Sequence, residues 1–141
     1  MKQFSLATVA VLAFLATFAG PDPVARAASV LARIDISEQR MTVFVDGRRA
    51  ARWPVSTARR GYRTPVGTFR PVRMYKRYFS KKYHSSPMPY SVFFHGGYAI
   101  HGTNAIRSLG RPASHGCIRL HPDNARQLFT MIERHGKRNA R

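Results

Sequence analysis

The 141-residue chain carries 24 lysines and arginines against 6 aspartates and glutamates, which gives a formal net charge of +18 at pH 7. This length fits one ordinary domain, and the charge indicates an anionic partner, although adaptation for solubility would also account for it. No acidic residue occurs between Asp46 and Asp123, so the paired carboxylates of a glycoside hydrolase are not expected in that region.

Residues 1–27 have the pattern of a secretory signal peptide. A lysine at the start precedes an apolar run over 6–19, and small residues follow at 25–27. The run is shorter than the about 20 apolar residues that a membrane-spanning helix needs. We therefore predict cleavage after Ala27, no stable membrane anchor, and export to the periplasm or the cell wall.

The mature chain begins with a hairpin pattern. Apolar residues alternate with others over 41–45, and the dipeptide at 46–47 is Asp-Gly, a frequent two-residue hairpin turn. Extended residues resume toward Trp53 and Val55. We predict a β-hairpin over this stretch.

The middle of the chain mixes strand and loop signals. Residues 66–72 predict an extended piece at a sheet edge or a bend, because Pro71 has no N–H to donate to a ladder. Residues 73–89 are basic, aromatic and bracketed by prolines, which predicts a long surface loop. Two apolar runs within 90–102, joined by Gly-Gly at 96–97, predict a second hairpin.

The last segment has the features of an amphipathic helix. Pro122 and Asp123 are suited to its first turn, and Gly136 is suited to its end. One face carries the apolar residues Ala125, Leu128, Phe129 and Ile132. The pattern predicts a mainly β domain over 28–136 with one C-terminal α-helix, followed by a solvated basic tail at 137–141.

Cys117 is the single cysteine of the chain. In an exported protein structural cysteines come in pairs, so a lone one indicates an intermolecular link or a reactive group, with a buried small hydrophobe as the alternative. A nucleophilic thiol needs a base or a positive environment. His115 would share a strand face with it, and His101 ends the preceding strand, so both are candidate bases. The backbone N–H groups of Cys117 and Gly116 could hold an oxyanion.

Other chemistries have weaker support in the sequence. His121 stands four residues after Cys117, but zinc sites prefer more thiolates or a His-x-x-x-His spacing, so neither a metal nor another cofactor is expected. His95 lies in an HGG turn like that of serine esterases, but no G-x-S-x-G motif accompanies it, which favours a hairpin tip. No nucleic-acid-binding motif is recognisable, so nucleic acid is not an expected partner.

The stretch IHGTNAIRSLGRPASHGCIRL, residues 100–120, resembles the catalytic signature of the L,D-transpeptidases (the YkuD-type domain), in which a histidine precedes an S-H-G-C block. The resemblance extends upstream to DISEQRMTVFVDG, RTPVGTF and SPMPYSVFFHGGYAIHGT. It implies an L,D-transpeptidase-like β-sandwich, in which two packed sheets close a cleft around the cysteine loop.

The same resemblance implies roles for individual residues. Cys117 would be the acylated nucleophile, and His101 would be the general base and acid, oriented through the carbonyl of Gly102. His115 and Gly116 stand where the family shapes the oxyanion pocket and supports the thiol.

Three further residues complete the predicted site. Ser114 would orient the cysteine loop. Arg119 and Tyr98 are predicted substrate contacts, although the family pattern often has asparagine at the position of Arg119.

The resemblance further implies a reaction on peptidoglycan. The thiolate would attack a tetrapeptide stem at the L-centre of diaminopimelate, release D-alanine, and pass the acyl group to an amine of a neighbouring stem or of an envelope protein. Transfer to water, as in an L,D-carboxypeptidase, and an inactive cationic wall-binding protein remain the alternatives. We expect a monomer that acts in cell-wall cross-linking or remodelling and in cell shape.

Overall fold

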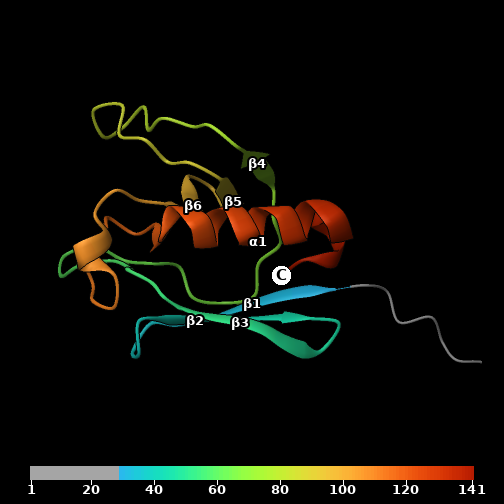
Figure 1. Ribbon diagram of the computed structural model, residues 1–141. Helices are drawn as coiled ribbons and strands as arrows, with labels where there is room; N and C mark the ends of the chain where they lie inside the picture. Colours follow the sequence, from blue (N-terminus) through green and yellow to red (C-terminus); the bar gives the residue numbers. More distant parts are fainter. Residues whose placement is uncertain (1–28) are drawn as a thin grey trace, which may run out of the picture.

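The computed structural model describes residues 29–141, and the predicted signal peptide at 1–27 lies outside these residues. Two sheets and one long helix surround a common core (Figure 1). The first sheet has the order β1-β2-β3, and the second has the order β4-β5-β6-β7. The strands are β1 (Val30–Asp35), β2 (Arg40–Val45), β3 (Arg48–Pro54), β4 (Arg73–Tyr75), β5 (Ser91–His95), β6 (Tyr98–Gly102) and β7 (Ile118–Leu120), and the helix is α1 (Pro122–His135). The predicted mainly β fold with one C-terminal helix is confirmed.

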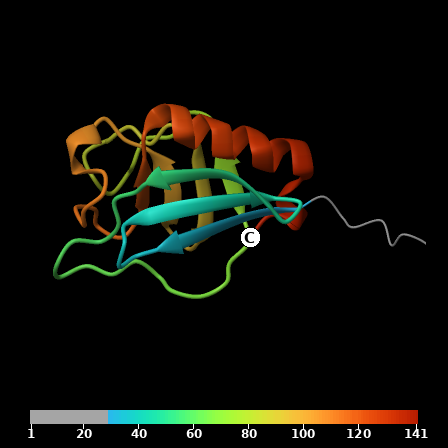
Figure 2. The ribbon, with the colours of Figure 1, turned by 60° about the horizontal axis from the view of Figure 1, so that its bottom comes forward.

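The first predicted hairpin is confirmed as the antiparallel pair β2–β3. Its turn residues Asp46 and Gly47 both have positive φ, +51° and +79°, as a two-residue hairpin turn requires. Because side chains alternate along a strand, Met41 and Val43 face inward and are fully buried. Figure 2 shows this sheet lying across the strands of the second sheet, with α1 along one side.

The second predicted hairpin is confirmed as the antiparallel pair β5–β6. Strand β7 then pairs with β6 in parallel, and Ile100 lies opposite Ile118. The connection over 103–117 contains a short 3-10 helix, η1 (Ile106–Ser108), and carries the S-H-G-C block to the start of β7. This topology brings the two halves of the sequence signature onto adjacent strands.

The structure agrees with one prediction for the middle of the chain and corrects another. Residues 66–72 form no strand but contain a bend at Gly67, and the Val72 N–H lies 2.8 Å from the carbonyl oxygen of Phe93 in β5. The predicted loop at 73–89 is wrong for its first three residues, which form the edge strand β4. Three residues are too few to show a period, and their pairing depends on the distant β5 rather than on local pattern.

Helix α1 is confirmed with the predicted boundaries. His121 caps it, because its Nδ1 accepts a hydrogen bond from Asp123 N at 3.2 Å, and Gly136 ends it at φ +82°. Within residues 29–141, no helix is both long and apolar enough to cross a membrane.

The prediction of a solvated tail does not hold for Ala140, and the backbone of the exposed Arg141 is paired with β1. After a 3-10 helix, η2 (Lys137–Asn139), Ala140 is 1% exposed and bridges in parallel to Val30. Arg141 N donates to Val30 O at 3.0 Å, and Ala32 N donates to Arg141 O at 2.8 Å. The chain therefore extends the first sheet at the free edge of β1.

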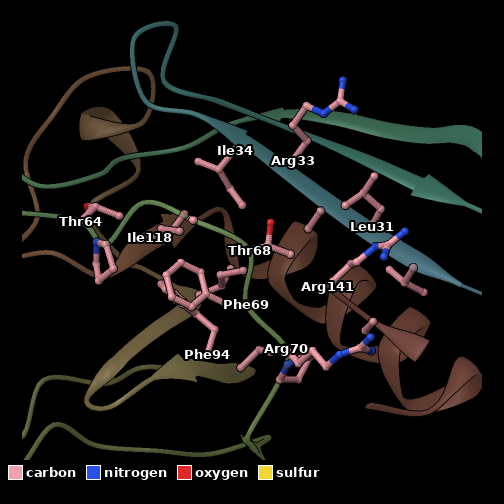
Figure 3. Close-up of a pocket in the computed structure, with 18 of the residues that line it drawn as sticks. Leu31, Arg33, Ile34, Thr64, Thr68, Phe69, Arg70, Phe94, Ile118 and Arg141 are labelled. Carbon is pink, nitrogen blue, oxygen red and sulfur yellow. The ribbon is translucent and has the colours of Figure 1, made fainter. Parts of the chain in front are cut away.

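An apolar cavity of about 440 Å³ lies between β1, residues 64–71 and the second sheet. Ile34, Phe69, Phe94 and Ile118 surround it in Figure 3, and the rings of Phe69 and Phe94 are 5.3 Å apart. The described residues that line it include no cysteine, histidine or acidic residue. This cavity is a feature of the core side of the second sheet.

Candidate active site

A second cavity of about 510 Å³ contains the lone thiol. Its walls come from residues 80–88, the β5–β6 turn, the end of β6 with the residues that follow it, and the segment 114–119. The structure brings six of the predicted site residues to this cavity, namely Tyr98, His101, Ser114, His115, Cys117 and Arg119. The two predicted glycines, Gly102 and Gly116, adjoin these residues in the chain.

Strand register explains why His101 and Cys117 meet at one cavity. His101 lies opposite Arg119 in the parallel pair β6–β7. Cys117 lies in the bend directly before β7, where it packs beside Phe93 and Ala99 and lines the same cavity as His101. Ile100 and Ile118, which directly precede His101 and Arg119, project from the other face of the sheet, into the core.

His101 is only 6% exposed. Its Nδ1 lies 2.7 Å from the carbonyl oxygen of Gly102, so Nδ1–H donates and Nε2 keeps the free lone pair. Burial, helped by the charge of Arg119 and opposed by the hydrogen bond to Gly102, lowers the pKa of His101 to about 4. The imidazole is therefore neutral at neutral pH, which is the form that accepts a proton.

Gly102 allows close packing behind this histidine. A Cβ atom at Gly102 would lie 3.0 Å from Pro89 Cγ and 3.1 Å from Pro122 Cα. The N–H of Gly102 also donates to Pro89 O at 2.8 Å. The carbonyl that holds His101 is thus itself fixed by two neighbouring segments.

The thiol of Cys117 points at backbone groups of the β5–β6 turn. Sγ donates to Gly97 O at 3.9 Å. Burial raises the pKa of the Cys117 thiol, whereas a backbone hydrogen bond from Ala99 and the charge of Arg119 lower it. Since burial is the largest of these effects, the resting group is the protonated thiol, and it needs a base to become a nucleophile.

The backbone before the cysteine is held by two hydroxyl groups. Ser114 Oγ donates to Cys117 O at 2.6 Å and accepts a hydrogen bond from Gly116 N at 3.0 Å. Thr64 Oγ donates to Gly116 O at 2.9 Å. Because the Gly116 N–H is engaged by Ser114, the structure does not support its predicted use as a donor to an oxyanion.

Gly116 instead meets a steric requirement. Its φ is +127°, and a Cβ atom would lie 2.5 Å from Tyr98 Cε1 and 2.7 Å from Arg63 O. A side chain therefore does not fit between Tyr98 and the 63–64 segment.

His115 lies between two aromatic rings rather than on a strand. The strand begins only at Ile118, so the expectation that His115 and Cys117 share a strand face is wrong. The His115 ring stacks on Tyr83, with centroids 4.4 Å apart at 10°, and meets the edge of Tyr62 at 4.6 Å and 73°. Burial, followed by the charges of Arg59, Arg119 and Lys82, lowers the pKa of His115.

The cavity is positively charged. Lys82 and Arg119 line it, and no described lining residue is acidic. Arg119 is half-buried, its Nη1 donates to Ala113 O at 3.4 Å, and its charge favours the thiolate of Cys117 over the thiol. An anionic substrate would meet complementary charge on entry.

Sequence reasoning missed Thr64, Tyr62 and Tyr83. Thr64 stood inside a motif that carried the resemblance, but no pattern in the sequence connects it to Gly116. The aromatic character of the 73–89 loop is a usable signal for Tyr83.

Two other histidines have contacts elsewhere. His121 caps α1, and the His95 ring lies 5.3 Å from the Phe69 ring. Residues 29–141 contain no cluster of three or more histidine, cysteine or acidic side chains suited to a metal ion.

Residues 29–137 match the family of L,D-transpeptidase catalytic domains named YkuD. The Probable L,D-transpeptidase ErfK/SrfK of Escherichia coli is 35% identical over 97 residues, which cover 61% of this chain and 31% of that protein. The chain thus spans about a third of the length of this curated relative.

Solved structures give the same assignment of fold. L,D-transpeptidases from Mycobacterium smegmatis and Stackebrandtia nassauensis match with TM-scores of 0.69 and 0.65, each at 29% identity. These matches cover 74% and 76% of this chain and 54% and 51% of those chains. The LD transpeptidase LdtMt1 in complex with imipenem matches with a TM-score of 0.68 at 25% identity, over 73% of this chain and 54% of that chain.

Proposed function

Because the chain belongs to the L,D-transpeptidase catalytic domain family, we propose that it is a peptidoglycan L,D-transpeptidase that works through a cysteine thioester. One observation carries the proposal. Cys117, the residue directly before β7, and a neutral His101, fixed by the carbonyl of Gly102, line one cavity. This is the arrangement of a nucleophile with an oriented base.

The reaction follows from the states of these two groups. His101 Nε2 takes the proton of the Cys117 thiol as sulfur attacks the carbonyl at the L-centre of diaminopimelate in a tetrapeptide stem. The C–N bond to D-alanine breaks, and His101 returns the proton to the leaving amine. An acceptor amine then attacks the thioester, the C–S bond breaks, and the proton released by the amine restores the thiol through His101.

The positive charge of the cavity fits the carboxylates of such a stem. Arg119 and Lys82 line the cavity at two of its walls, and guanidinium and ammonium groups form the stronger, charge-assisted hydrogen bonds with carboxylates. Tyr98 lines the cavity beside Gly116 and contacts the substrate in this proposal.

The cellular setting is part of the same proposal. Export through the segment 1–27 would bring the protein to the periplasm or cell wall, where stem peptides and envelope-protein amines are available. Its net positive charge would concentrate it on anionic wall polymers. It would act there as a monomer in wall cross-linking or remodelling and so affect cell shape.

Mass spectrometry of reactions with defined tetrapeptide muropeptides tests the proposal. We expect loss of D-alanine together with cross-linked dimers, and no reaction with the Cys117→Ala variant. Loss of D-alanine without dimers would identify an L,D-carboxypeptidase. No loss at all would leave an inactive wall-binding protein.

Imipenem provides a second test that needs no stem peptide. We expect it to acylate Cys117, as a mass increase that Cys117→Ala abolishes. A wild-type protein that forms neither this adduct nor a thioester with muropeptides would contradict the assignment of Cys117 as nucleophile.

A further inference from the structure

The loop over 76–90 is anchored at its base on the face of the second sheet that carries the thiol. Tyr78 and Met88 pack there with Phe93, Ala99 and Cys117, and Met88 is 7% exposed. The ring centroids of Tyr78 and Phe93 are 5.0 Å apart, and Met88 N donates to Tyr78 O at 2.8 Å. The base therefore has its own apolar contacts and backbone pairing.

The tip of this loop, residues 80–86, is a turn with internal hydrogen bonds. Ser80 N donates to Ser86 O at 2.9 Å, and Tyr83 N donates to Ser80 Oγ at 3.1 Å. Ser86 Oγ donates to Tyr83 O at 2.7 Å. These bonds fix the shape of the tip, but they do not attach it to the rest of the domain.

The contact of Tyr83 with His115 makes that attachment. The Tyr83 and His115 rings are nearly parallel at 4.4 Å, and Tyr62 makes a T-shaped contact with His115 at 4.6 Å. His115 stands two residues before Cys117 in the segment that Ser114 and Thr64 hold in place. The stack therefore joins the tip to the segment that carries Cys117.

The tip is a wall of the catalytic cavity. Ser80, Lys82, Tyr83 and Ser86 line the same space as His101 and Cys117. Displacing the tip would open this wall to solvent. Water would then reach an acyl group on Cys117 more freely.

We propose that Tyr83 is a positioning residue, whose stack on His115 holds the tip over Cys117 and sets how the thioester divides between amine and water. The proposal rests on the thioester chemistry of the proposed function. Both fates break the same C–S bond. Attack by an amine forms an amide, attack by water forms a carboxylic acid, and each attacking group gives up the proton that restores the thiol.

Three variants test this role. Tyr83→Ala removes the ring, Tyr83→Phe keeps it without the hydroxyl, and His84→Asn changes an exposed neighbour whose positive φ asparagine accepts. Each protein receives the same tetrapeptide donor and amine acceptor, and mass spectrometry gives the ratio of trimmed to transferred product.

We expect Tyr83→Ala to raise this ratio about two- to tenfold, as the loss of one aromatic pair allows. Tyr83→Phe and His84→Asn should keep the wild-type ratio. A wild-type ratio in Tyr83→Ala, with D-alanine still released, would overturn the proposal. So would an equal rise in Tyr83→Phe, because the hydroxyl rather than the stack would then be responsible.

Hydrogen exchange measures the attachment without any substrate. Amides of residues 80–86 should exchange faster in Tyr83→Ala than in the wild type or in Tyr83→Phe, while those of β5 stay protected. Unchanged exchange at the tip would overturn the proposal. If Tyr83→Ala loses protection throughout the domain, the variant is unfolded, and the same exchange measurement is made on Tyr83→Leu, where unchanged exchange at the tip would overturn the proposal. A wild type that releases no D-alanine refutes the proposed function instead, and the exchange data still decide whether the stack holds the tip.

Discussion

Neighbouring residues of β6 and β7 line two unlike cavities. Ile100 and Ile118 line the cavity of about 440 Å³, which has no histidine or cysteine among its described lining residues, whereas His101 and Cys117 line the cavity of about 510 Å³. The two residues of each neighbouring pair project from opposite faces of one sheet. The strand pair β6–β7 and the residue directly before β7 therefore supply both core contacts and the side chains of the candidate site, on opposite faces of one sheet.

The sharpest way to break this separation is to change Cys117 and its neighbour Ile118, the first residue of β7. Cys117→Ala should lower turnover by at least about 10⁴-fold, because no other group replaces the nucleophile. Its free energy of unfolding should change by less than about 1 kcal/mol. Ile118→Ala should keep the turnover of the folded protein but lower its free energy of unfolding. Ile118 is 4% exposed, and truncating a buried isoleucine costs about 2–5 kcal/mol.

Steady-state assays and urea unfolding of both variants measure these effects. Equal losses of stability in the two variants would mean that the thiol also supports the core. Loss of turnover in Ile118→Ala at full folding would mean that the two faces are coupled.

The adjacent pair on β6 gives the next largest effect. His101→Gln should lower turnover by about 10²–10⁴-fold through loss of the general base. Ile100→Val should keep turnover and cost about 0.5–1.5 kcal/mol of stability.

His101 also predicts a pH dependence that Ile100 lacks. Its pKa is about 4 in the folded protein and 6.5 in the unfolded chain, so between these values the unfolded state binds more protons. Stability contributed by this group is present above pH 6.5 and is lost as the pH falls toward 4, by up to about 3 kcal/mol. Urea unfolding at pH 7 and pH 4 should show a larger decrease for the wild type than for His101→Gln, and parallel decreases would contradict the buried, neutral imidazole.

Thr64 sharpens the comparison because it belongs to both regions. It lines the apolar cavity, yet its hydroxyl donates to Gly116 O and accepts from Ala58 N at 3.0 Å. Thr64→Val should cost about 1–3 kcal/mol for the unpaired buried groups and should lower turnover less than His101→Gln does. Thr68→Val, an exposed change at the same cavity, is the matched control for both measurements, and an equal effect there would argue against a role for the Thr64 hydroxyl.

The sequence allowed most of the regular elements to be predicted, and Cys117 and His101 line one cavity. Asp46–Gly47 and Gly96–Gly97 are local turn signals, and the apolar face of α1 has a helical period, so each can be recognised within a short window. The motif resemblance then indicated which histidine accompanies the thiol.

The remaining features depend on contacts between distant segments. Strand β4 exists because Arg73–Tyr75 pairs with β5, and the last two residues are ordered by the edge of β1. Neither segment has a period of its own. The engagement of Gly116 N–H by Ser114 and the stacking of Tyr83 on His115 depend on side-chain geometry, which no spacing rule supplies.

The charge of the catalytic cavity has a practical consequence for covalent labelling. Lys82 and Arg119 line it without an acidic partner among the described lining residues, so it should attract reagents that carry negative charge. The rate of Cys117 alkylation, divided by the rate with a small free thiol, should be higher for iodoacetate than for neutral iodoacetamide. Electrophilic reagents aimed at Cys117 would accordingly gain selectivity from a carboxylate placed beside the reactive group.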